Sequence, residues 1–203
     1  MTSPSLSSSG HHGVCPWWLA YTFDNPVRRL IHKPQKILGN YVKEGMTVID
    51  LGCGMGHFSI GMAGLVGSAG KVIAVDLQQK MLDIMSRRSR RAGLDDRIIP
   101  HLCRADAIDI DESVDFILAF WMVHEVPDQN QFFNQLKSFL AAKGKILIAE
   151  PTMHVTAQDL ERTVKTAHSC GLQCIEKPDI RFSHAALLAL GPNFERASRV
   201  CPK

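Results

Sequence analysis

The sequence predicts an α/β protein with a doubly wound, mostly parallel sheet of seven strands. Two observations support this fold class. From Thr47 onward, short apolar runs alternate with amphipathic stretches of helical length, which is typical of repeated βαβ units. The 203 residues also suffice for one domain with a substantial core, and the 45% hydrophobic and 21% charged residues are ordinary for a globular protein.

Seven apolar runs predict the strands, five before residue 150 and two in the carboxyl-terminal third. The expected strands are 47–51, 71–75, 98–103, 114–119, 144–149, 172–176 and 181–189. Helices are expected between them at 57–66, 78–92, 129–141 and 156–170. The interval 104–113 alternates acidic and apolar residues, so its helix content stays open. Ahead of the first strand, Pro26 and Pro34 divide the chain into short helical pieces.

Composition and charge argue against several classes of protein. No apolar run approaches the roughly 18 residues that span a bilayer, and the amino terminus lacks the pattern of a secretory signal. We therefore expect no membrane contact and a cytoplasmic location, with the six cysteines reduced. The net charge of +3 is too small to indicate nucleic acid. The basic run 87–91 is expected to complement a helix dipole ahead of Gly93, with an anionic partner as the alternative.

A glycine-rich turn follows the first expected strand, in the stretch VIDLGCGMGHF. Its glycines stand at positions 52, 54 and 56. A dinucleotide-binding fingerprint would need its third glycine at position 57, where this chain has His57. The turn therefore argues against a nicotinamide oxidoreductase, and failure to bind NAD would settle that alternative.

Two acids flank this turn and indicate the kind of ligand. Asp76 ends the second expected strand, where a carboxylate can accept both hydroxyls of a ribose. Asp50 lies two residues ahead of Gly52, where it would repel a pyrophosphate and attract an ammonium or a sulfonium. A nucleoside joined to a cationic amino acid satisfies both acids. S-adenosylmethionine is such a ligand.

At this point the chain resembles the class I S-adenosylmethionine-dependent methyltransferases, from about Gln35 to the end of the fifth strand. VIDLGCGMG and VIAVDLQQKML resemble the first two motifs of that family, and CRADA resembles the third. VDFILAFWMVHEVPD and KGKILIAEP resemble the fourth and fifth. The resemblance implies the Rossmann-like methyltransferase fold and a small-molecule acceptor, in the branch akin to quinone-biosynthesis enzymes.

The resemblance also implies roles for individual residues. The glycine turn lines the cofactor with Asp50 beneath its amino-acid portion, and Asp76 holds the ribose. Leu77 packs on the adenine, Asp106 and Ala107 meet its edge, and Phe120 borders the methionine side chain. Ordinary core packing explains Leu77 and Phe120 equally well. The expected cofactor-binding residues are Asp50, Gly52, Cys53, Gly54, Asp76, Leu77, Asp106, Ala107 and Phe120.

Candidate residues for the acceptor follow the fourth and fifth strands. His124 could take a proton from the acceptor, with Glu125 or Glu150 orienting it, or it could make a purely structural hydrogen bond. His154 is a weaker candidate. Two histidines and two glutamates could hold a divalent ion, but they lack a metal-type spacing, so we expect no metal.

The expected domain layout has a flexible arm at 1–14 and one methyltransferase domain at 15–203. That domain comprises an amino-terminal helical lid at 15–46, the cofactor-binding core at 47–150 and the carboxyl-terminal strands at 151–203. The stretch CPWWLAYTF within the lid is aromatic, and Tyr21 in it is a candidate active-site residue. The alternative is a hydrophobic anchor for the amino terminus.

Three other functions or mechanisms are weighed against methyl transfer to a small molecule. A non-catalytic module that binds S-adenosylmethionine would bind the cofactor without turnover. A nucleic-acid methyltransferase is disfavoured, because no Asn-Pro-Pro-Tyr type motif follows the fourth strand. Capture of the acceptor by converging cysteines is not supported by their positions. The sequence leaves both a monomer and a homodimer open, and it does not identify the methyl acceptor.

Overall fold

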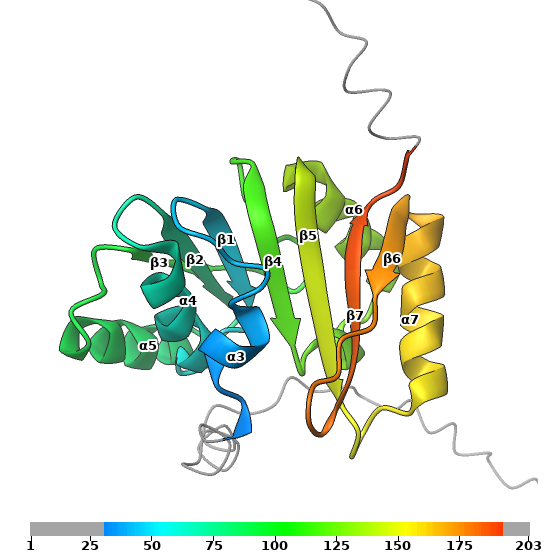
Figure 1. Cartoon of the computed structure of the whole chain (residues 1–203), viewed down its shortest axis with the longest axis horizontal. Coiled ribbons are helices and arrows are strands. Elements are labelled where there is room, and N and C mark those ends of the chain that lie inside the picture. Colours follow the sequence, from blue (N-terminus) through cyan, green and yellow to red (C-terminus); the bar gives the residue numbers. More distant parts are fainter. Residues whose placement is uncertain (1–30, 193–203) are drawn as a thin grey trace, which may run out of the picture.

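A computed structural model describes residues 31–192 of the chain. Its centre is a seven-stranded sheet in the order β3-β2-β1-β4-β5-β7-β6 (Figure 1). Every neighbouring pair from β3 to β5 is parallel, and β7 runs antiparallel to both β5 and β6. The expected α/β class and mostly parallel sheet are confirmed. The strands are β1 (Thr47–Leu51), β2 (Lys71–Asp76), β3 (Ile98–Leu102), β4 (Val114–Phe120), β5 (Leu140–Pro151), β6 (Leu172–Glu176) and β7 (Ser183–Leu190).

Helices cover both faces of the sheet. One face carries α3 (Pro34–Leu38), α4 (His57–Val66) and α5 (Gln79–Arg91), and the other carries α6 (Gln129–Phe139) and α7 (Ala157–Ser169) (Figure 1). The alternation of side chains along β4 produces the two cores. Phe116 and Leu118 pack toward α3, α4 and α5, whereas Ile117 and Ala119 pack toward α6 and α7.

Local sequence signals explain where several helices begin and end. Thr156 and Asp159 form a reciprocal capping box at the start of α7, and the Asp128 side chain accepts from the N–H of Gln131 at the start of α6. The last turn of α5 contains three arginines of the basic run, and Gly93 follows at a φ of 65°. This placement agrees with the dipole role expected from the sequence.

The junction between α6 and β5 differs from the expectation. The helix ends at Phe139 and the strand begins at Leu140, instead of a helix to 141 and a strand from 144. Leu140 pairs with Val114 and is 7% exposed, and the pairing resumes only at Lys145 opposite Phe116. Pairing and burial of Leu140 therefore outweigh the helical preference of the alanines that follow it. Residues 104–113 form no helix.

The topology gathers the ends of the strands that carry the predicted site. The carboxyl ends of the parallel strands β1, β2, β4 and β5 lie at one edge of the sheet, the lower edge in Figure 1. Of the expected lid, the described part begins at residue 31 and includes α3. Tyr21 and the neighbouring aromatic residues lie outside the described residues. Within residues 31–192, no helix is both long and apolar enough to cross a membrane.

Candidate active site

The turn that joins β1 to α4 contains the three glycines of the predicted loop. Gly52, Gly54 and Gly56 have φ angles of 65°, 53° and 82°, a conformation that other residues rarely adopt. A Cβ on Gly56 would lie 2.4 Å from Cγ of Met85, and one on Gly52 would lie 3.2 Å from Met122. A Cβ on Gly54 would meet nothing within 4 Å. Packing therefore requires Gly56, whereas Gly54 presents bare backbone to open space.

Cys53 lies inside this turn, with its side chain buried in the core. Burial raises the pKa of its thiol well above the usual value. The N–H of Cys53 donates to the carbonyl of Val75 at 3.0 Å, and its own carbonyl accepts from the N–H of Gly56 at 3.0 Å. Cys53 therefore shapes the loop through its backbone.

Asp76 ties the glycine turn to the end of β2. Its Oδ2 accepts from the N–H of Gly54 at 2.9 Å, and its Oδ1 accepts from the N–H of Gln78 at 2.9 Å. The side chain is 8% exposed, and burial raises the pKa of the carboxyl group while the backbone donors partly offset that effect. Each carboxylate oxygen has two acceptor positions, so both can also accept from a ligand hydroxyl.

Asp50 is buried at the end of β1, where it is 2% exposed. The hydroxyl of Ser59 on α4 donates to its Oδ2 at 2.5 Å. Ser59 is fully buried, and we did not single it out from the sequence. The sequence feature that could have indicated Ser59 is a polar side chain within the otherwise apolar helix α4. A buried hydroxyl there needs a hydrogen-bond partner.

Two exposed leucines lie near Asp76 in the sheet, one next to it in the sequence and one opposite it on β3. Leu77 follows β2 and is 39% exposed, and Leu102 ends β3 and is 52% exposed. Leu102 is the register partner of Asp76. Leu102 is thus a second exposed apolar residue near Asp76, and the sequence patterns did not reveal it.

Asp106 and Ala107 lie in the connection between β3 and β4. The Asp106 side chain is 73% exposed and lies 3.5 Å from the guanidinium of Arg104. Arg104 and Ala107 bond each other's backbone, with N···O distances of 3.0 and 3.4 Å. This turn holds the residues that the resemblance assigns to the adenine edge.

Phe120 ends β4 within an aromatic group. Its ring centroid lies 4.4 Å from that of Phe58, 5.4 Å from that of Trp121 and 5.2 Å from that of His32. Trp121 has a φ of 62°, which breaks the alternation of the strand and brings its ring to the same core as Phe120. The indole N–H of Trp121 donates to the hydroxyl of Ser183 on β7 at 2.9 Å. Phe120 is therefore well packed, and its predicted cofactor contact stays a prediction.

His124 lies in the short 3-10 helix η1 (Val123–Glu125) after β4, and its partner is Glu150 at the end of β5. The imidazole Nδ1 hydrogen-bonds to Oε2 of Glu150, and Oε1 accepts from the N–H of Val123 at 2.8 Å. This hydrogen bond is the main cause that raises the pKa of His124, and partial burial opposes it. The buried carboxylate accepts a hydrogen bond from Nδ1, so the neutral imidazole has its proton on Nδ1. Nε2 is then the nitrogen that can accept a proton. Of the two acids that could orient His124, the structure places Glu150 on the imidazole.

A cleft of about 270 Å³ opens beside this pair. Its lining residues come from η1, β5, α6, α7 and the connection between β5 and α7: His124, Gln129, Glu150, Val155, Asp159, Arg162, Thr163 and Thr166. The ring of His154 lies 6.3 Å from that of His124, and Glu125 is half-buried in the same turn. Among residues 31–192, no three histidine, cysteine or acidic side chains are grouped as metal ligands.

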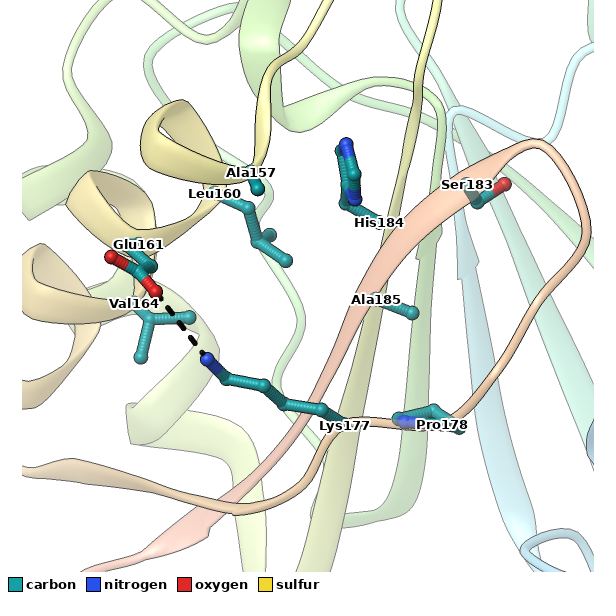
Figure 2. A pocket seen from close by; sticks show the side chains of 9 residues that line it. All are labelled: Ala157, Leu160, Glu161, Val164, Lys177, Pro178, Ser183, His184 and Ala185. Carbon is teal, nitrogen blue, oxygen red and sulfur yellow. Dashed lines mark ion pairs between the residues drawn. The ribbon is translucent and has the colours of Figure 1, made fainter.

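A second cavity of about 210 Å³ lies between α7 and β7 and contains none of the predicted site residues (Figure 2). Leu160 and Val164 of α7 face Ala185 across it. At one side Lys177 pairs with Glu161 at 3.7 Å. The lysine and the glutamate neutralise each other at that side of the cavity.

Comparison with known proteins decides the family. A family model described as a methyltransferase domain matches residues 42–182. The chain belongs to the methyltransferase domain family. The match spans the glycine turn, Asp76, His124 in η1 and Glu150 on β5, so the family predicted from the sequence motifs is confirmed.

Relatives of the chain agree with the predicted branch. It is 35% identical over 112 residues to a demethylmenaquinone methyltransferase of Lactobacillus johnsonii, covering 54% of this chain and 45% of the relative. It is 29% identical over 126 residues to methyltransferase GfsG of Streptomyces halstedii, covering 61% and 44%. The chain thus spans about half the length of the curated relatives it matches.

A solved structure supports the same fold. The crystal structure of a SAM-dependent methyltransferase from Aquifex aeolicus superimposes with a TM-score of 0.78 at 22% identity, covering 86% of this chain and 98% of that one. The superposition confirms the Rossmann-like fold expected from the resemblance.

Proposed function

We propose that the protein transfers a methyl group from S-adenosylmethionine to a small-molecule acceptor and leaves S-adenosylhomocysteine. One observation carries this proposal. The open backbone at Gly54, bonded to Asp76, lies at the same sheet edge as the His124–Glu150 pair. A nucleoside site and a proton acceptor at one edge are what a methyl transfer to a hydroxyl, amine or thiol needs.

The residues at the first three strands fit the cofactor. The bare backbone at Gly54 lets a nucleoside approach closely, and the Asp76 carboxylate has acceptor positions left for the ribose hydroxyls. Leu77 and Leu102 offer an apolar surface to an adenine ring. Asp50 contributes a buried negative charge beneath the turn, which favours a cationic ligand. When bound, S-adenosylmethionine supplies a sulfonium, from which the methyl group leaves readily.

His124 would take the proton that the acceptor loses as it is methylated. Glu150 fixes the ring and its tautomer, so the lone pair of Nε2 accepts the proton. The N–H of Val123 holds the other oxygen of Glu150, which keeps the carboxylate in one orientation. As the imidazole becomes positively charged, the buried carboxylate beside it stabilises that charge.

The relatives named demethylmenaquinone methyltransferases suggest the class of acceptor. We propose a small molecule with a hydroxylated ring, whose hydroxyl proton His124 would accept. The same proposal includes a cytoplasmic enzyme that works without a metal, a membrane or nucleic acid, as a monomer or a homodimer.

The test is a screen of ring-hydroxylated acceptors with methyl-labelled S-adenosylmethionine, in which the labelled product is identified by mass spectrometry. Calorimetry should first show binding of S-adenosylhomocysteine and none of NAD. Label in one acceptor class, abolished in a protein with the substitution Asp76→Ala, would support the proposal. Cofactor binding without labelled product from any acceptor would favour the non-catalytic alternative.

A further inference from the structure

The loop between β3 and β4 is held in place by two glutamines of α6. The side-chain amides of Gln131 and Gln135 donate to the backbone carbonyl of Asp106 at 3.1 and 3.0 Å. Gln135 also accepts, through Oε1, from the N–H of Ile108 at 2.8 Å. The carbonyl of Asp106 thus accepts from two side-chain amides. The amide of Gln135 also bonds to the N–H of Ile108, so it holds the loop at two points.

The geometry of α6 places both glutamines on the same side of the helix. They are four residues apart, so they lie one above the other on one face. Buried Phe132, Phe133 and Leu136 anchor the helix to the sheet and fix its rotation. The two amides therefore reach the loop from a rigid support.

The carbonyl that they hold belongs to the peptide unit that joins Asp106 to Ala107. A peptide unit is planar, so fixing the direction of its carbonyl also fixes the direction of the Ala107 N–H. That N–H makes only a long hydrogen bond to the carbonyl of Arg104, at 3.4 Å. The glutamines consequently orient the group that the resemblance assigns to the adenine edge.

We propose that Gln131 and Gln135 are positioning residues that set the recognition of the adenine base. This inference rests on the proposed function, because it presumes that S-adenosylmethionine occupies the site. No sequence motif pointed to α6 as part of the cofactor site. In the folded protein, α6 supports the adenine side of that site without touching the cofactor itself.

The test compares two ligands that differ only in the base. S-adenosylhomocysteine has the 6-amino group of adenine, and S-inosylhomocysteine has a carbonyl in its place. Calorimetry would give the dissociation constants of both for the unaltered protein and for variants with Gln131→Ala, Gln135→Ala and both together. We expect the double variant to bind S-adenosylhomocysteine about 5- to 30-fold more weakly, as expected for one or two lost hydrogen bonds. Its preference for adenine over hypoxanthine should fall by a similar factor.

Asn134→Ala is the matched control. Asn134 is an exposed amide residue of the same helix, whereas the carbonyl of Asp106 is held by Gln131 and Gln135. Its removal should leave the affinity for both ligands unchanged. Because Gln131 is exposed and Gln135 is half-buried, the variants should fold, and thermal melting would check this.

The outcomes separate this inference from the function on which it rests. An unchanged ratio of the two dissociation constants in the double variant, with tight binding retained, would overturn the positioning role and leave the enzyme proposal intact. An unaltered protein that does not bind S-adenosylhomocysteine would overturn both.

Discussion

The two halves of the site use their buried carboxylates in different ways. At the cofactor half, Asp76 accepts from two backbone N–H groups and Asp50 accepts from a serine hydroxyl. At the acceptor half, Glu150 accepts from one backbone N–H and from the imidazole of His124. All three acids are at most 8% exposed. These hydrogen bonds differ in the donor, which is a backbone N–H or a serine hydroxyl in the first half and includes a titratable imidazole in the second.

This contrast shows that burial alone does not mark a catalytic acid. Asp76 fixes the course of the backbone at the glycine turn, and Asp50 is tied to α4 through Ser59. Glu150 is bonded to the imidazole of His124, a group that can change its charge near neutral pH. Substitutions in the first half should therefore alter folding and binding, and those in the second half should alter turnover and its pH dependence.

The largest expected effect comes from His124→Ala. Loss of the proton acceptor should lower kcat by about 10²- to 10⁴-fold, while the affinity for S-adenosylhomocysteine stays nearly the same. Steady-state kinetics with an identified acceptor and calorimetry would measure the two quantities. His168→Ala, on the exposed part of α7, is the control and should change neither. A parallel loss of melting temperature and activity would instead make His124 a structural residue.

Gly56→Ala should destabilise the fold more than Gly54→Ala. At Gly56 a Cβ meets Met85 at 2.4 Å and the φ is 82°, so we expect a loss of about 2–4 kcal/mol in the free energy of unfolding. At Gly54 only the positive φ opposes the Cβ, and a loss of about 1 kcal/mol is expected. Gly54→Ala should nevertheless bind S-adenosylhomocysteine more weakly. Urea titration and calorimetry would test both, and equal stability of the two variants would contradict the packing assignment.

Asp76→Ala should weaken cofactor binding by about 1–3 kcal/mol, since charge-assisted hydrogen bonds to the ribose are lost. Asp115→Ala is a matched control, because the Asp115 carboxylate also accepts a backbone N–H, that of Thr47 at 3.0 Å. Asp115 lies at the start of β4, at the opposite end of the strand from the site. Comparable affinity of the two variants in calorimetry would count against the ribose assignment.

The smallest effect is expected from Glu150→Gln, which removes the charge and keeps the shape. The hydrogen bond to Glu150 raises the pKa of His124 above 6.5, so activity that needs the neutral imidazole should rise with pH through that raised value. Glu150→Gln should shift the rising part, or limb, of the pH profile of kcat/KM to lower pH. The stability of the fold should change with pH in the opposite direction to the activity. The stabilisation by the raised pKa is complete below about 6.5 and is lost as pH rises through the folded value. A limb that does not move would exclude His124 as the titrating group.

Much of the fold could be predicted because the relevant signals are local. The alternation of apolar runs and amphipathic stretches located all seven strands, and the arginines of α5 with Gly93 marked the end of that helix. The prediction was wrong where a tertiary contact competed with a local preference, as at Leu140, which pairs with Val114 directly after the helix.

The candidate site was predictable in part for the same reason. The glycine turn and Asp76 follow a local pattern of a strand, a bend and an acid. Ser59, Leu102 and the two glutamines of α6 were missed, and the glutamines have partners more than 20 residues away in the sequence. The sequence proposed Glu125 and Glu150 as equal partners of His124, and only the approach of β5 to η1 selects Glu150.

By itself, the sequence determined the order of strands and helices, the flexible glycines at one bend and the acids beside it, because backbone preference and side-chain period act over a few residues. The tertiary structure decided which groups meet. It placed Glu150 on His124, Ser59 on Asp50 and the amides of α6 on the carbonyl of Asp106. These contacts depend on the strand order β3-β2-β1-β4-β5-β7-β6 and on the register of each pair. Both are set by burial of the whole sheet between its two helical layers, which no short stretch of sequence contains.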